Sequence, residues 1–359
     1  MLNFEPKKIA KLINYRDKLL LMGSCFTEHI GNALHESKFS LLQNPNGILF
    51  DPVSVCNSLI SYVENKQYKE SELFLLNEVW NSWQHHSRFS HIDRSEGLRI
   101  INESQQQAHE FLKEANWVII TLGTSFSYRL TPPLHLVERG PTGEVTPPPH
   151  PVERGPTGEV TPPLHFVERG PGGEVANCHR APAQWFSKHL LRIQEVIEAL
   201  DGCIHQLFQF NPRLQIIFTI SPVRHIRDGV IDNNRSKARL IEAVHHLVSK
   251  FDKLHYFPAY EIVIDILRDY RFYDIDFVHP NYMATDFVLQ KFAASCLDDE
   301  ARQLMEELKK ISIARRHKAF QPTTTAHKQF LQTSAEKTKE LQKKYPFLDL
   351  KEELEYFTS

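Results

Sequence analysis

The chain has 359 residues, and its Lys+Arg count of 42 nearly balances its Asp+Glu count of 44, which gives a formal net charge of −2. Proteins that bind nucleic acid carry an excess of positive charge, so we expect no nucleic-acid partner. Five scattered cysteines without a C-x-x-C pair argue against a disulfide framework or a zinc site, and the apolar stretch at 19–22 is too short for a signal peptide or a membrane span, so we expect a cytoplasmic protein without membrane contact.

Apolar runs alternate with helical patterns along most of the chain. The first strand is expected at 19–23, and Ser24 then precedes a pattern of apolar residues with helical spacing. Further strands are predicted at 117–122, 215–220 and 255–264, and further helices at 53–63, 185–200, 237–250 and 282–296. Apolar strands separated by helices are typical of a parallel sheet covered on both faces, which predicts a doubly wound α/β domain over residues 1–300.

A tandem repeat interrupts this domain. Residues 131–175 are three copies of a 15-residue unit that hold 11 of the 21 prolines and 7 of the 14 glycines. Because proline removes backbone donors and the unit has few apolar residues, we expect a solvated, polyproline-II-like loop rather than a solenoid. A protein partner that reads proline-rich segments is one use for such a loop, and a neutral duplication is the alternative.

The end of the chain differs in composition from the domain. From about Asp298 onward the residues are charged and have helical patterns, which predicts a helical C-terminal extension over 301–359.

The first motif with chemical content is Gly23-Ser24-Cys25-Phe26. In doubly wound folds, ligands bind at the carboxyl ends of the strands, and Ser24 falls at such an end and at a helix N-terminus. A serine there is well placed as a nucleophile, because the helix dipole favours the negative charge that develops in acyl transfer. A serine that caps the helix has the same sequence signature, and the motif alone favours the cap.

The second motif is Asp276-Phe277-Val278-His279-Pro280. Its spacing lets Asp276 accept a hydrogen bond from one ring nitrogen of His279 and leaves the other nitrogen free to act as a base. A capping aspartate beside a surface histidine looks the same in sequence, so this motif alone is weak.

Together, and in this order, the two motifs resemble those of the GSCFA family, which looks like a branch of the SGNH/GDSL hydrolase superfamily. The resemblance covers about residues 1–300 and continues more weakly into the tail. The other blocks that resemble the family are Asn44–Ile48, Leu122–Thr124, Asn177–His179, Ser221–His225 and Ser236–Lys237. The resemblance implies a three-layer α/β/α sandwich with a flavodoxin-like sheet. It also implies ester hydrolysis without metal or cofactor, in which Ser24 attacks, His279 is the general base and Asp276 orients it.

The resemblance also implies an oxyanion hole. In the superfamily it is formed by the N–H of the serine, the N–H of a glycine and the side chain of an asparagine in a G-x-x-N block. Ser24 and Gly47 match the first two. The third block reads Gly123-Thr124-Ser125-Phe126 and lacks the asparagine. Asn177 is the expected replacement if the strands that flank the insert bring it close to Gly123, and Thr124 is the alternative donor.

Several competing interpretations carry less weight. The thiolate of Cys25 would be a stronger nucleophile than a serine hydroxyl, but in the turn that we expect its side chain points away from the site. Gly123–Ser127 is a near miss to the G-x-S-x-G nucleophile motif. The histidines at 85–86 with Cys178 and His179 lack metal-ligand spacing. His86 and Arg224 are expected either to line the substrate pocket or to form ordinary polar surface.

The sequence thus predicts a hydrolase that acts on an O-acyl or O-acetyl ester of a small molecule or carbohydrate. An acyltransferase that uses the same triad is the first alternative, since an acyl-serine can react with a hydroxyl group instead of water. A non-catalytic binding or scaffold protein that keeps the fold is the second, and the missing asparagine favours it.

Overall fold

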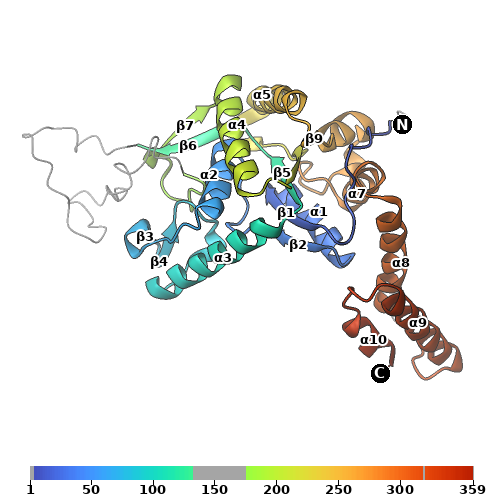
Figure 1. The fold of residues 1–359 in the computed structure, drawn as a ribbon. Helices are drawn as coiled ribbons and strands as arrows, with labels where there is room; N and C mark the ends of the chain where they lie inside the picture. The colour runs from blue at the N-terminus through green and yellow to red at the C-terminus, as the bar shows by residue number, and fades with distance from the viewer. Residues whose placement is uncertain (1–3, 132–174, 318–319, 359) are drawn as a thin grey trace, which may run out of the picture.

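The computed structural model describes residues 4–131, 175–317 and 320–358. At its centre lies a five-stranded sheet in the order β2-β1-β5-β8-β9 (Figure 1). The strands are β1 (Lys18–Gly23), β2 (Ser40–Gln43), β5 (Trp117–Leu122), β8 (Gln215–Ile220) and β9 (Leu254–Tyr256). All four pairings are parallel. Counted along the chain within this sheet, the order is 2-1-3-4-5, which is that of flavodoxin-like folds and confirms the predicted α/β class.

Both faces of the sheet are covered because its strands are apolar on both sides. Leu19 and Leu21 of β1 pack into one apolar cluster, while Leu20 and Met22 pack into another. The first cluster includes side chains of α1 (Cys25–Glu36) and α7 (Tyr282–Cys296). The second includes side chains of α2 (Pro52–Val63), α3 (Arg94–Glu114), α4 (Ile193–Phe210) and α5 (Gly229–Lys250). This is the three-layer sandwich (Figure 1).

Two small antiparallel pairs stand outside the central sheet. One joins β3 (Leu73–Leu76) to β4 (Val79–Ser82), and the other joins β6 (Phe126–Leu130) to β7 (Phe186–Leu190). The chain between β6 and β7 contains the tandem repeat, so the loop predicted for 131–175 lies almost wholly outside the described residues.

Two predicted elements are wrong in part. The helix predicted at 185–200 begins only at Ile193, because residues 186–190 pair with β6. The strand predicted at 255–264 ends at Tyr256, because Pro258 has no N–H to continue a ladder, and the helical turns of α6 (Ala259–Glu261) follow.

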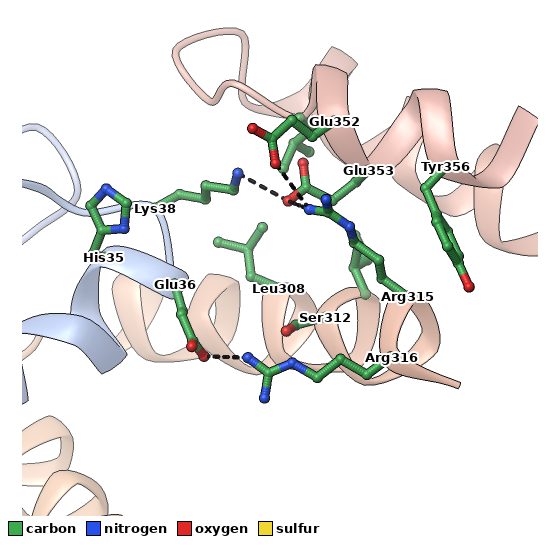
Figure 2. Close-up of a pocket in the computed structure, with 12 residues that line it drawn as sticks. His35, Glu36, Lys38, Leu308, Ser312, Arg315, Arg316, Glu352, Glu353 and Tyr356 are labelled. Carbon is green, nitrogen blue, oxygen red and sulfur yellow. Dashed lines mark hydrogen bonds and ion pairs between the residues drawn. The ribbon is translucent and has the colours of Figure 1, made fainter. Parts of the chain in front are cut away.

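The C-terminal region is helical, as predicted. It consists of α8 (Asp299–Arg316), α9 (Thr325–Lys344) and α10 (Lys351–Thr358), which stand to one side of the sandwich (Figure 1). Figure 2 shows its contacts with the end of α1 around a cavity of about 490 Å³. Glu353 pairs with Lys38 at 2.9 Å and Arg316 pairs with Glu36 at 2.8 Å, so ion pairs tie this region to the sandwich. In the described parts of the chain, no helix is both long and apolar enough to cross a membrane.

Candidate active site

The serine of the first motif lies where β1 ends and α1 begins. Gly23 has a φ of +132°, and a Cβ atom there would lie 2.1 Å from the carbonyl oxygen of Thr121 on β5. Only glycine fits this turn, because other residues are strained at such a φ and the neighbouring strand leaves no room. The glycine therefore sets the position of Ser24 at the carboxyl edge of the sheet.

The hydroxyl of Ser24 does not cap α1. Its side chain makes no capping hydrogen bond, whereas the side chains of Asp51, Asp93, Asn281 and Asp298 cap α2, α3, α7 and α8. Ser24 is 1% exposed, and its Oγ atom has no hydrogen-bond partner among the described residues. Buried hydroxyl groups normally find a partner, so the unpaired hydroxyl of Ser24, like those of Ser127 and Thr219, needs an explanation, and at the carboxyl edge of the sheet contact with a ligand is one. The capping interpretation of this serine is thus wrong.

The second motif forms a compact turn. Nδ1 of His279 lies 2.6 Å from Oδ2 of Asp276, and Oδ1 of Asp276 accepts the backbone N–H groups of Val278 at 2.9 Å and His279 at 3.0 Å. The N–H of His279, its imidazole ring and the N–H of Val278 together lower the pKa of the Asp276 carboxyl to about 2. Asp276 is therefore ionised at neutral pH and holds the imidazole by one nitrogen.

Both motifs contribute a side chain to the same apolar cluster. Val278 belongs to it, as do Phe26, two residues after Ser24, and Val223, which follows β8. The side chain of His279 is 43% exposed, and it forms no hydrogen bond with the buried Ser24 hydroxyl in the described structure. The structure thus shows the Asp276–His279 pair, and the contact of His279 with Ser24 stays a prediction.

The oxyanion set predicted from the sequence is not free to receive a ligand. The N–H of Ser24 donates to the carbonyl of Thr121 at 3.1 Å, and the N–H of Gly47 donates to the carbonyl of Asn44 at 2.7 Å. The first hydrogen bond extends the ladder between β1 and β5, and the second closes the turn after β2, so both amides already have partners.

Asn177 and Thr124, the two predicted replacements for the missing asparagine, form hydrogen bonds with groups other than Gly123. Asn177 donates its N–H to Trp83 and accepts the N–H of His179, and its hydrogen bonds in the described structure do not include Gly123. Thr124 Oγ1 contacts Ser236 Oγ at 3.0 Å and accepts the N–H of Phe126. Asn177 thus contacts the segment after β4, and the Thr124 hydroxyl joins β6 to α5, while their roles as oxyanion donors stay predictions.

Asn44 is a site residue that the sequence reasoning missed. Its Oδ1 accepts the N–H of Gly23 at 2.8 Å, and its Nδ2 is buried without a hydrogen-bond partner among the described residues. An unpaired amide donor thus lies on the side chain that holds the Met22–Gly23 peptide. The sequence signal for it is the block Asn44–Ile48, in which the resemblance assigns a role to Gly47 alone.

His86 and Arg224 are the two residues predicted to line a pocket, and they lie against Gly47 and Tyr273. His86 packs against Gly47, where a Cβ atom would lie 2.1 Å from that of His86, and it keeps part of its surface exposed. Arg224 lies over the ring of Tyr273 at 5.4 Å, on the chain that leads to Asp276. The neighbouring His225 packs edge-on against Phe50, and both rings border Gly123.

The competing sites gain no support from the geometry. Burial raises the pKa of the Cys25 thiol, which disfavours the reactive thiolate. His85 Nδ1 bonds to Ser82 Oγ at 2.8 Å, and His179 Nε2 bonds to the Ser82 carbonyl at 2.7 Å, so each ring serves packing. Across the described ranges no three His, Cys, Asp or Glu side chains gather as a metal site.

Comparison with known families gives two matches. A model described as the GSCFA family matches residues 18–139 and 165–292, and one described as the C-terminal domain of GSCFA domain proteins matches residues 308–359. The gap in the first match, 140–164, falls inside the tandem repeat. No curated protein matches the chain.

Proposed function

This chain belongs to the GSCFA family, and from that premise we propose that it is an ester hydrolase of the SGNH type. Ser24 is the nucleophile, His279 the general base and Asp276 the residue that orients it. The substrate class is an O-acyl or O-acetyl ester of a small molecule or carbohydrate. The observation that carries this proposal is the Ser24 hydroxyl, which is buried, unpaired and free of the capping role that would explain it otherwise.

The reaction uses the hydroxyl of Ser24, the imidazole of His279 and the carboxylate of Asp276. His279 Nε2 takes the proton of the Ser24 hydroxyl while Oγ bonds to the ester carbonyl carbon. The alkoxy group then leaves with that proton as an alcohol, and an acyl-serine remains. Water attacks the acyl-serine with His279 again as base, which releases the acid and restores Ser24. Asp276 stays ionised throughout, in line with its low pKa.

The link between Ser24 and His279 has to form when substrate binds. Catalytic hydrogen bonds are often long or absent in unliganded enzymes and tighten in the complex. The exposed turn of Asp276 and His279 suits such an adjustment, because Val278 anchors it to the core while both functional side chains remain near solvent.

A fluorophosphonate probe tests the proposal directly, because it reacts with activated serines and leaves capping serines intact. We expect one adduct, located at Ser24 by mass spectrometry, and its loss in Ser24→Ala and His279→Ala. Ser295→Ala is the matched control, since Ser295 is also buried but bonds within α7. Folding of each variant is checked by circular dichroism.

The outcomes separate the alternatives. Ser24 labelling together with release of free acid from a nitrophenyl ester supports hydrolysis, while labelling with acyl transfer to an added alcohol and no free acid supports the acyltransferase. A folded wild-type protein that takes no label contradicts the proposal, and the non-catalytic binding protein then becomes the leading hypothesis.

A further inference from the structure

Helix α5 carries a group of buried polar residues in its first half. Asn233, Ser236 and Lys237 are 3%, 1% and 1% exposed. Lys237 is thus a lysine inside the protein, and the ion pairs of the described residues give it no carboxylate partner. Burial of an ammonium group is costly unless it is compensated.

The compensation comes from two backbone carbonyl groups beside the candidate site. Nζ of Lys237 donates to the carbonyl of Gly123 at 2.5 Å and to that of Ser221 at 2.7 Å. Gly123 follows β5 and Ser221 follows β8, so the ammonium group joins the carboxyl ends of two central strands. It also lies 6.0 Å from the ring centre of Tyr260.

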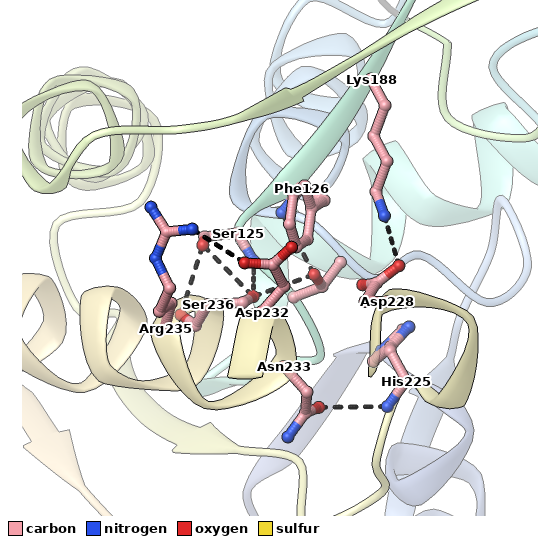
Figure 3. Close-up of polar contacts among 10 residues, drawn as sticks. Ser125, Phe126, Lys188, His225, Asp228, Asp232, Asn233, Arg235 and Ser236 are labelled. Atoms are coloured by element: carbon pink, nitrogen blue, oxygen red, sulfur yellow. Dashed lines mark hydrogen bonds and ion pairs between the residues drawn. The ribbon is translucent and has the colours of Figure 1, made fainter. Parts of the chain in front are cut away.

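The neighbours of Lys237 on α5 hold the same two turns. Ser236 Oγ accepts the N–H of Ser125 at 2.7 Å, and Asn233 Oδ1 accepts the N–H of His225 at 3.1 Å (Figure 3). Ser236 thus holds the turn after β5 and Asn233 the turn after β8, while Lys237 bonds to both turns.

Asn211 is a buried clamp away from the candidate site and serves as a comparison. It is 3% exposed and donates from Nδ2 to the carbonyl groups of Leu112 at 3.0 Å and Ala115 at 2.8 Å, at the end of α3 and on the amino side of β5. This neutral clamp holds a helix end, whereas Lys237 holds the turns that follow two strands.

Lys237 interacts electrostatically with ionisable groups at the same edge of the sheet. Its ammonium group counteracts the effect of burial on the pKa of the Cys25 thiol, next to Ser24, and adds to the effect of burial that lowers the pKa of His225 to about 4. Burial lowers the pKa of Lys237 itself to about 7.

We propose that Lys237 is a positioning residue for the reaction of Ser24: its Nζ atom bonds to the carbonyl groups of Gly123 and Ser221 and so fixes the turns that follow β5 and β8, at the carboxyl edge of the sheet where Ser24 follows β1. Groups held rigidly around a reacting atom keep it in its reactive geometry, and their loss slows the chemical step more than it weakens substrate binding. The inference rests on the proposed function, because it assigns Lys237 a part in that same reaction.

The test compares Lys237→Met with Asn211→Leu, which removes the neutral clamp at the end of α3. For each variant we would measure thermal stability, the rate of fluorophosphonate labelling at Ser24, and kcat and KM for a nitrophenyl ester. We expect both variants to lose stability, but only Lys237→Met to lose labelling rate and kcat, on the order of 10²-fold with little change in KM. Lys237→Arg, which keeps charge and donors, should recover part of the rate. If Lys237→Met does not fold, Lys237→Gln replaces it.

Two results would overturn the inference in different ways. Wild-type-like labelling in folded Lys237→Met, or rate losses in both variants that follow their unfolded fractions, would leave Lys237 with a structural role only. A wild-type protein that is itself unlabelled at Ser24 would overturn the proposed function, and the inference with it.

Discussion

The side-chain carbonyl of Asn44 accepts the N–H of Gly23 at 2.8 Å and so holds the peptide that joins Met22 to Gly23, one residue before Ser24. The Nδ2 atom of the same amide is buried without a hydrogen-bond partner among the described residues, as is Ser24 Oγ. We expect this free amide donor to bind the oxyanion that forms when Ser24 attacks a substrate.

We expect Asn44→Asp to slow Ser24 labelling on the order of 10²-fold, because a carboxylate keeps the acceptor for Gly23 but replaces the amide donor. Labelling kinetics at matched folded fraction measure this effect. Labelling at the wild-type rate in a folded Asn44→Asp variant would remove Asn44 from the site.

Gly23→Ala should destabilise the fold by about 1–3 kcal/mol or prevent folding, since the φ of +132° is strained for alanine and its Cβ would collide with Thr121. Gly202→Ala is the matched control, because this glycine lies inside α4 with no atom within 4 Å of the added methyl group. The control should gain roughly 0.5–1 kcal/mol from the better helix propensity of alanine. Urea unfolding of both variants checks the pair, and equal effects would contradict the turn geometry.

Asp276→Asn should lower Ser24 labelling by on the order of 10²–10⁴-fold, because an amide neither selects the required tautomer of His279 nor stabilises its charged form. The folded-state pKa of Asp276 is depressed. Its side chain therefore stays ionised at pH values where an ordinary aspartate is protonated, and it takes up a proton only as the pH falls through about 2. An NMR titration of the Asp276 carboxyl should therefore show a midpoint near 2. A midpoint in the ordinary range for aspartate would mean that the turn is not formed as described.

Stability should fall with acid between roughly pH 6.5 and 4, through two buried histidines. Burial lowers the pKa of His85 to about 3 and that of His179 to about 4. The unfolded chain binds these protons first, so stability is full above the unfolded pKa and declines as pH drops towards the folded values. The slope should be on the order of 1 kcal/mol per pH unit for each ring.

His85→Phe tests this dependence, because His85 packs between the rings of Tyr68 and Phe89 and a phenyl group fills that space. Urea midpoints measured from pH 7 to 4 should fall less steeply for the variant than for the wild type. Parallel curves for the two proteins would show that His85 is not buried as a neutral ring.

The sequence by itself determined the fold class and the two motifs. Apolar runs such as 19–22 and 117–122 are buried on both faces, and such runs separated by helices fit only a covered parallel sheet. Short or half-exposed strands lack these continuous apolar runs. Strand β2 has four residues with a mixed pattern, and the residues of β7 fit the helix predicted at 185–200 although they pair with β6.

Only the tertiary structure decided which polar atoms of the site are free. The occupied N–H of Ser24, the bond from Gly23 to Asn44 that holds its unpaired amide, and the two carbonyl partners of Lys237 all depend on backbone atoms that come together from segments distant in sequence. A motif states which residue types are present and in what order. Whether a hydroxyl caps a helix or stays free is set by neighbours that are distant in sequence, and spacing along one chain contains no information on them.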